Sequence, residues 1–240
     1  ATNTSSLSVS AMAEGLAHPE RVVGFHFFNP VAVMPLLEIA RGSRTDDAAL
    51  ATAFSVGKTL KKTCVLVQDA PAFVVNRLLT RYLGEVMRAV DEGTPVDIAD
   101  GATNSLGMPM SPFALLALVG PAVAYHVSET MHAAFPDRFY VSANLKRIVD
   151  SGRTTFDADT AALLEQGSTP STQEQVLARV VDALADETRR IFDRDQYSSL
   201  LVRVNEDAAR SNLVAKVEGD KRFQLRAESE TEYYKKQTMT

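Results

Sequence analysis

The stretch that decides the fold comprises residues 22–40 and reads VVGFHFFNPVAVMPLLEIA. Residues 22–28 form a short apolar run with β-branched and aromatic side chains, which is the composition of a buried strand. The Asn29-Pro30 dipeptide ends this strand, because proline cannot donate a hydrogen bond to a β-ladder. A second strand is predicted at residues 34–39, so the stretch predicts two strands joined by a turn.

The residues that follow complete an α/β pattern. A Thr-Asp-Asp sequence at residues 45–47 predicts a helix running to about Lys61, because capping and acidic residues favour a helix N-terminus. Residues 63–68 form a third strand candidate. The order strand, strand, helix, strand predicts the C-terminal part of an α/β sheet domain, which we assign to residues 1–68.

An all-α domain is predicted at residues 69–196. The tripeptide Asp-Ala-Pro that opens it reads as a helix start, and apolar residues then recur at helical spacing up to Val90. A loose stretch is expected at residues 151–171. Residues 197–240 are polar and weakly periodic, so we leave them unassigned and expect them to be partly disordered. The further helices are predicted at about residues 95–106, 112–119, 121–135, 141–150 and 172–192.

Composition narrows the class of protein. The 240 residues are 45% hydrophobic and 23% charged, which excludes a disordered or collagenous chain, and no apolar run is long enough for a membrane span. The net charge of -5 comes without a basic block, which argues against nucleic acid as a partner. The single cysteine, Cys64, is typical of a reducing compartment, and we expect the cytoplasm. Because the chain opens at Ala1 without an initiator Met or a signal segment, we interpret it as part of a longer protein.

His26 is the histidine best placed for chemistry. It interrupts an apolar strand just before a turn, and ligands of open α/β sheets bind at strand ends. The other three, His18, His126 and His132, are interpreted as surface or helix residues. A purely structural role for a lone strand histidine stays open at this point.

Glu38 strengthens the functional interpretation of His26. It is a lone acid within an apolar strand, where a carboxylate is costly to bury unless it is paired. Adjacent strands joined by the Asn29-Pro30 turn can bring positions 26 and 38 side by side. Such a pair would be a general base with its orienting acid.

Polar side chains flank this pair in the sequence. Asn3 and Ser5 stand where a preceding strand would end, and Asn76 is an amide near the start of a long apolar helix. Two structural alternatives stay open: Ser5 or Ser6 as the cap of a helix near Ser8, and Asn76 as an exposed helix residue.

Four blocks of the sequence resemble the L-3-hydroxyacyl-CoA dehydrogenase family. They are ATNTSSL at residues 1–7, GFHFFNPV at 24–31, MPLLE at 34–38 and DAPAFVVNRLL at 69–79, in the expected order and spacing. Residues 107–120 are similar to the next block, although Ser111 stands where glycine is usual. Residues 125–140 look most like the multifunctional fatty-acid oxidation proteins, which join an enoyl-CoA hydratase to this dehydrogenase.

The resemblance implies a reaction and a set of site residues. The reaction is the NAD-dependent oxidation of L-3-hydroxyacyl-CoA to 3-ketoacyl-CoA in fatty-acid β-oxidation, with no metal. The partners implied are an acyl-CoA substrate and either a homodimer or a larger β-oxidation complex. The residues implied are His26 and Glu38 for catalysis, Ser5 and Asn76 for the substrate, and Asn3, Ser5 and Asn29 for the nicotinamide end of NAD.

One departure concerns the cofactor. The family needs a strand, a Gly-x-Gly-x-x-Gly turn and a helix to hold the pyrophosphate of NAD, and this chain contains no Gly-x-Gly. We therefore expect part of a Rossmann-type nucleotide-binding sheet followed by an all-α C-terminal domain, and an isolated chain without turnover. The alternative is a non-catalytic dimerisation or acyl-CoA-binding module that lacks the nucleotide cradle.

Overall fold

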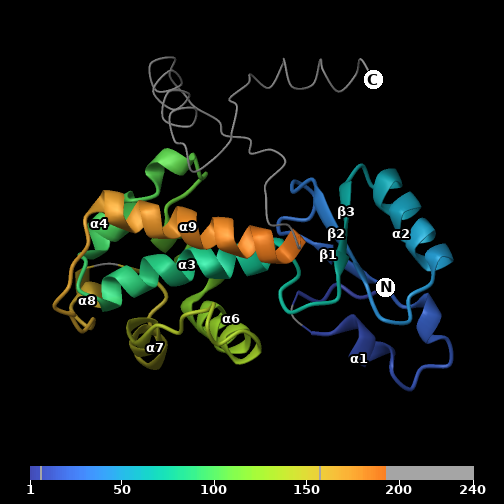
Figure 1. Ribbon diagram of the computed structural model, residues 1–240, viewed down its shortest axis with the longest axis horizontal. Coiled ribbons are helices and arrows are strands. Elements are labelled where there is room, and N and C mark those ends of the chain that lie inside the picture. The colour runs from blue at the N-terminus through green and yellow to red at the C-terminus, as the bar shows by residue number, and fades with distance from the viewer. Residues whose placement is uncertain (6, 157, 193–240) are drawn as a thin grey trace, which may run out of the picture. The chain divides into compact units, whose positions relative to one another are not determined.

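The computed structural model describes residues 1–5, 7–156 and 158–192 (Figure 1). An α/β part comes first in the chain and a set of helices follows, as the sequence predicts. The prediction of a disordered, unassigned segment at residues 197–240 lies outside the described residues, as does the predicted end of the helical domain at residue 196.

A three-stranded mixed sheet forms the α/β part. Its strands are β1 (Gly24–Phe27), β2 (Leu36–Arg41) and β3 (Thr63–Gln68), in that spatial order. β1 pairs antiparallel with β2, and β2 pairs parallel with β3. On the other side of β1, Thr2 forms a parallel bridge with Gly24. All three predicted strands are present, but β2 starts after Pro35 rather than at residue 34, because proline has no N–H to donate to a ladder.

The two faces of the sheet are covered by different elements. α2 (Asp47–Thr59) is capped by the carboxylate of Asp46, which accepts a hydrogen bond from Ala49 N at 2.6 Å. It covers the face on which the apolar residues Val23, Phe25, Leu37, Ile39, Leu50 and Ala53 pack together. The opposite face carries a smaller cluster made of Val9, Ala40, Val67 and Phe73.

The short helix α1 (Val9–Ala13) packs on the sheet face opposite α2. Its N-terminus differs from two predictions. Its cap is Ser8, whose Oγ accepts from Ala11 N at 3.1 Å, so the capping role considered for Ser5 is wrong. The helix-start assignment at residues 69–71 is wrong too. Asp69 instead binds the N-terminus of α1, and the next long helix starts four residues after Pro71.

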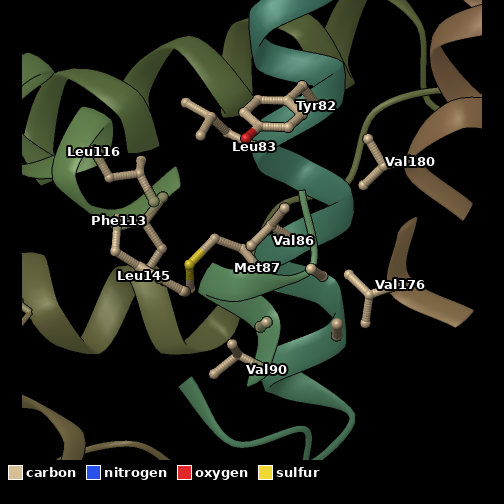
Figure 2. Packing of buried hydrophobic residues seen from close by; sticks show 13 residues of the cluster. Tyr82, Leu83, Val86, Met87, Val90, Phe113, Leu116, Leu145, Val176 and Val180 are labelled. Carbon is tan, nitrogen blue, oxygen red and sulfur yellow. The ribbon is translucent and has the colours of Figure 1, made fainter. Parts of the chain in front are cut away.

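The helical part is built around α3 (Val75–Asp91) (Figures 1 and 2). Its buried face carries Leu83, Val86 and Met87, and α9 (Gln173–Phe192) lies along it through Val176 and Val180. The elements between them are α4 (Val96–Gly101), a 3₁₀ turn at Asn104–Leu106, α5 (Pro112–Val119), α6 (Pro121–Ala134), α7 (Ala143–Asp150) and α8 (Ala158–Ala161).

Two observed elements differ from the predicted helices. The single helix predicted at residues 95–106 is divided into α4 and a 3₁₀ turn. The stretch predicted to be loose, residues 151–171, contains the four-residue α8, too short for its periodicity to be recognised.

No single helix in the described part of the chain is long and apolar enough to cross a membrane. α5 and α6 satisfy that test only as a pair, and the pair is bent by 96°.

Candidate active site

His26 and Glu38 are direct neighbours across the first two strands. The β1–β2 register pairs them, so both side chains project from the same face of the sheet. His26 Nδ1 lies 2.8 Å from Glu38 Oε2, which confirms the predicted contact. Both residues are buried, with 5% of His26 and none of Glu38 exposed to solvent. The carboxylate in the apolar strand is therefore paired, as its burial requires.

The second oxygen of Glu38 binds the start of α3. Glu38 Oε1 accepts hydrogen bonds from the backbone N–H groups of Val74 at 3.1 Å and Val75 at 3.0 Å. These N–H groups have no partner within the helix, and the N-terminus of a helix favours a negative charge. Glu38 thus joins the sheet to the first long helix of the helical part, and both of its oxygens are satisfied.

This arrangement determines which nitrogen of His26 can act as a base. A carboxylate only accepts hydrogen bonds, so the proton of a neutral imidazole is assigned to Nδ1. Nε2 then carries a lone pair, and the interactions found for the described residues include no hydrogen bond to it. The ring is flanked by Phe28 at 4.6 Å and Phe73 at 5.7 Å between centroids. A histidine oriented in this way is suited to take a proton from a bound molecule.

The other predicted site residues take different positions. Asn3 Oδ1 accepts a hydrogen bond from Phe27 N at 2.9 Å, so this side chain is anchored one residue along the strand from His26. Asn29 is exposed just after β1 and is joined to Pro30 by a cis peptide bond.

The two residues predicted to bind substrate are both half-buried. Asn76 lies in the first turn of α3, next to one of the two residues that bind Glu38, so it is not the freely exposed helix residue considered above. Ser5 lies in the segment between the Thr2 bridge and α1.

Arg77 is a buried polar residue that the sequence prediction missed. Its Nε and Nη2 both donate to the Pro71 carbonyl, at 3.2 and 3.0 Å, and it is 7% exposed. The available signal was an arginine within an otherwise apolar helix, directly after Asn76. The turn at residues 71–73 was missed because proline there was interpreted as the first residue of a helix.

Two family models match this chain. The model described as "3-hydroxyacyl-CoA dehydrogenase, NAD binding domain" matches residues 1–70, and the one described as "3-hydroxyacyl-CoA dehydrogenase, C-terminal domain" matches residues 73–162. They agree with the observed order of an α/β part and a helical part, which is the Rossmann-type and all-α fold class predicted above. The cofactor that these models indicate is NAD.

Known proteins point the same way. A relative from Acinetobacter baumannii (strain AYE), named fatty acid oxidation complex subunit alpha, is 32% identical over 207 residues, which are 82% of this chain and 28% of that protein. The structure of 3-hydroxybutyryl-CoA dehydrogenase from Escherichia coli K12 is 35% identical with a TM-score of 0.60, covering 63% of this chain and 33% of that one. FadB2 from M. tuberculosis is 36% identical with a TM-score of 0.59, covering 62% and 54%.

The fold and the matches define a chain with part of a dehydrogenase NAD-binding domain followed by a dehydrogenase C-terminal domain. The chain belongs to the 3-hydroxyacyl-CoA dehydrogenase family. It spans about a quarter to a third of the length of the curated relatives it matches, 28% in the case of the A. baumannii protein.

The described residues do not provide for the pyrophosphate of NAD. Helix N-termini are the usual phosphate sites in such domains, but those of α1, α2 and α3 each hold a carboxylate of this chain. These carboxylates belong to Asp69, Asp46 and Glu38 respectively. The 240 residues also lack the glycine-rich turn.

Proposed function

We propose that this chain carries the proton-transfer site of an NAD-dependent L-3-hydroxyacyl-CoA dehydrogenase of fatty-acid β-oxidation. The observation that carries the proposal is the buried His26–Glu38 hydrogen bond of 2.8 Å, with Glu38 held by two backbone N–H groups. Membership of the family supports the reaction type. The geometry adds a reason why His26 rather than another histidine would be the base.

In the proposed reaction, the 3-hydroxyl group of the substrate gives its proton to Nε2 of His26. The C3–H bond breaks with loss of a hydride, and a carbonyl forms at C3. NAD, when bound, supplies the hydride acceptor. The imidazolium that forms on His26 is stabilised by the Glu38 carboxylate through Nδ1–H, while the N–H groups of Val74 and Val75 hold that carboxylate in place.

We further propose supporting roles for the polar neighbours. Ser5 and Asn76 would hydrogen-bond the substrate near its reacting oxygen. Asn3, Ser5 and Asn29 would line the nicotinamide end of the cofactor. Since Asn3 is anchored to the backbone of Phe27, it would hold its segment against β1 as well.

The proposed domain division places the sheet part at residues 1–68 and the helical part at residues 69–196. Glu38 belongs to the first and receives its backbone hydrogen bonds from Val74 and Val75 of the second. The base and its orienting acid would then be complete only when both parts are folded. For the assembly, we propose an acyl-CoA substrate, a homodimer or larger β-oxidation complex, and a cytoplasmic setting. The name of the A. baumannii relative, fatty acid oxidation complex subunit alpha, supports the complex.

The test is the substitution His26→Gln in the full-length gene product, assayed by NADH formation from 3-hydroxybutyryl-CoA. We expect kcat to fall by a factor on the order of 10² to 10⁴ with little change in KM, because glutamine cannot take the proton. His126→Gln is the matched control, since His126 is exposed on α6, and it should leave kcat unchanged. Near-normal turnover of His26→Gln would contradict the proposed base.

The second candidate is the non-catalytic module, and one observation favours it: the N-termini of α1, α2 and α3 are occupied by carboxylates. It predicts that the full-length product binds acyl-CoA or dimerises without any turnover, and that His26→Gln changes neither property. The same assay, combined with acyl-CoA titration, therefore separates the two candidates.

A further inference from the structure

Arg77 donates hydrogen bonds to the turn at residues 71–73, which precedes α3. Its Nε and Nη2 converge on one acceptor, the carbonyl oxygen of Pro71, at 3.2 and 3.0 Å, and its own backbone N–H donates to the Ala72 carbonyl at 3.2 Å. The guanidinium group is rigid and planar, so two N–H groups on one carbonyl hold that carbonyl in a narrow range of positions.

The turn at residues 71–73 has an unfavourable backbone conformation. Ala72 and Phe73 have φ values of +59° and +44°, in the left-handed region that side chains with a Cβ atom rarely adopt. Consecutive residues in this region persist only when their surroundings hold them. Arg77 provides one such restraint, and the burial of both side chains provides another.

The turn touches both members of the His26–Glu38 pair. The two residues that follow it, Val74 and Val75, donate their N–H groups to Glu38 Oε1. Phe73 itself places its ring 5.7 Å from the ring of His26. A change in the turn would therefore move the groups that orient Glu38 together with the Phe73 ring that lies beside His26.

The other side of Arg77 is anchored in the helical part. Its guanidinium carbon lies 4.7 Å from the centre of the Phe135 ring, and its Nε lies 4.0 Å from Glu187 Oε1 on α9. Burial lowers the pKa of Arg77, Glu187 raises it and Arg138 lowers it, so Glu187 compensates part of the cost of burying this charge.

Arg138 is a natural control for Arg77. It stacks on the same Phe135 ring, at 4.4 Å, and its Nε donates to Glu187 Oε2 at 3.0 Å. No bond to Pro71 is among the interactions found for Arg138 in the described residues. Because Arg138 also pairs with Glu187 through Nη2, replacing Arg77 does not leave Glu187 without a partner.

We propose that Arg77 is a positioning residue for the His26–Glu38 pair. By holding the Pro71 carbonyl it fixes the turn at residues 71–73, and the turn aims two N–H groups at Glu38. Glu38 in turn holds the Nδ1–H of His26 and leaves Nε2 without the proton. The meaning of this for catalysis rests on the proposed function, but the effect on the tautomer of His26 does not.

The experiment is nitrogen NMR of the full-length gene product labelled with ¹⁵N-histidine, in which the Nδ1 and Nε2 shifts of His26 report which nitrogen carries the proton. The variants are Arg77→Lys and Arg77→Met. Lysine keeps the charge but lacks the planar pair of N–H groups that binds the Pro71 carbonyl, and methionine fills similar space without the charge or the N–H groups. We expect both to shift His26 from the pure Nδ1–H form toward a mixture of tautomers. Arg138→Lys, the matched control, should leave the His26 signals as in the parent, and thermal unfolding reports the stability of each variant.

Turnover gives a second readout on the same proteins. We expect kcat of the Arg77 variants to fall about 10- to 100-fold with a much smaller change in KM, because a misplaced base affects the reaction more than substrate binding. Unchanged His26 signals in folded Arg77→Lys and Arg77→Met would overturn the proposal, as would an equal change in Arg138→Lys. A tautomer shift without any turnover in the parent protein would support the positioning role and count against the proposed function.

Discussion

Ser8 and Asp69, 61 positions apart in the chain, are joined by a hydrogen bond of 2.8 Å from Ser8 Oγ to Asp69 Oδ2. The same carboxylate accepts the backbone N–H groups of Val9 and Ser10, both at 2.8 Å. A carboxylate directly after β3 thus caps a helix near the start of the chain. It links the segment that carries Ser5 to the turn that leads into α3.

Asp69 should make stability depend on pH. Burial would raise the pKa of Asp69, but the hydrogen bonds from Ser10, Val9 and Ser8 outweigh it and hold the pKa below its ordinary 3.8. A lowered folded-state pKa stabilises the fold above the unfolded value, and this stabilisation is lost as the pH falls through the folded value.

The corresponding substitution is Asp69→Asn. We expect it to lower the free energy of unfolding by about 1 kcal/mol at neutral pH, because asparagine keeps only one acceptor oxygen and loses the negative charge beside the N-terminus of α1. The difference from the parent should shrink as the pH falls below 3.8 and vanish only below the lowered folded-state pKa, where the carboxyl group is protonated in both states. Urea denaturation at several pH values measures this. Glu14→Gln, an exposed change at the other end of α1, should show no such pH-dependent loss.

Glu38 should matter for stability as well as for activity. Glu38→Ala leaves two backbone N–H groups and the Nδ1–H of His26 without their acceptor in a buried site, and we expect a loss of about 3–5 kcal/mol. Glu38→Gln keeps one acceptor oxygen, so it should lose clearly less stability than Glu38→Ala. It should also lower kcat less than His26→Gln does. Denaturant unfolding of both Glu38 variants checks the order of stability, and equal losses in the two would contradict a stabilising role of the retained acceptor oxygen.

Gly24 is predicted to be intolerant of a side chain. A Cβ atom there would lie 2.6 Å from Ala40 Cβ and 3.0 Å from Val9 Cγ2, where α1 packs closely on the sheet. We expect Gly24→Ala to destabilise the fold by about 1–3 kcal/mol. Gly84→Ala is the control, because its Cβ would meet only the Tyr140 carbonyl at 3.8 Å within helix α3. It should raise stability by about 0.5–1 kcal/mol, since alanine favours the helix.

The 240-residue chain should bind NAD weakly and show no measurable dehydrogenase turnover by itself. The reason is that the N-termini of α1, α2 and α3 are occupied and the glycine-rich turn is missing, so none of these three helices offers its N-terminus to the pyrophosphate. Calorimetric titration with NAD and a 3-hydroxybutyryl-CoA assay test this. Micromolar binding or clear turnover would mean that another segment holds the pyrophosphate.

Many elements were predictable because their ends carry local signals. α5 starts at Pro112 and stops before Gly120, and β3 coincides with the predicted apolar run at residues 63–68. The pairing of His26 with Glu38 was also predictable, since a lone acid and a lone histidine in consecutive apolar strands need each other when buried. These inferences depend only on neighbours in the sequence and on the period of the strand.

The carboxylate of Asp69 shows the limit of inference from neighbouring residues. Asp69 reads as the start of the helix that follows it, yet it caps a helix that precedes it by about 60 residues. Asp91, near the end of α3, likewise accepts from Ser142 Oγ at 3.0 Å and Ala143 N at 3.0 Å, at the N-terminus of α7. A carboxylate accepts hydrogen bonds from the free N–H groups that folding brings near it. The neighbouring sequence does not show which N–H groups these will be.

The sequence by itself determined the order of strands and helices, the fold class and the two residues of the central pair, because period, caps and unpaired charge are local properties. Only the tertiary structure decided what completes the pair. The N–H groups of Val74 and Val75 reach Glu38 across 36 and 37 positions of sequence, and Arg77 holds the turn that presents them. The local sequence does not identify which acceptor will bind the free backbone N–H groups at the start of a helix. That acceptor depends on how the sheet and the helix pack in the folded protein.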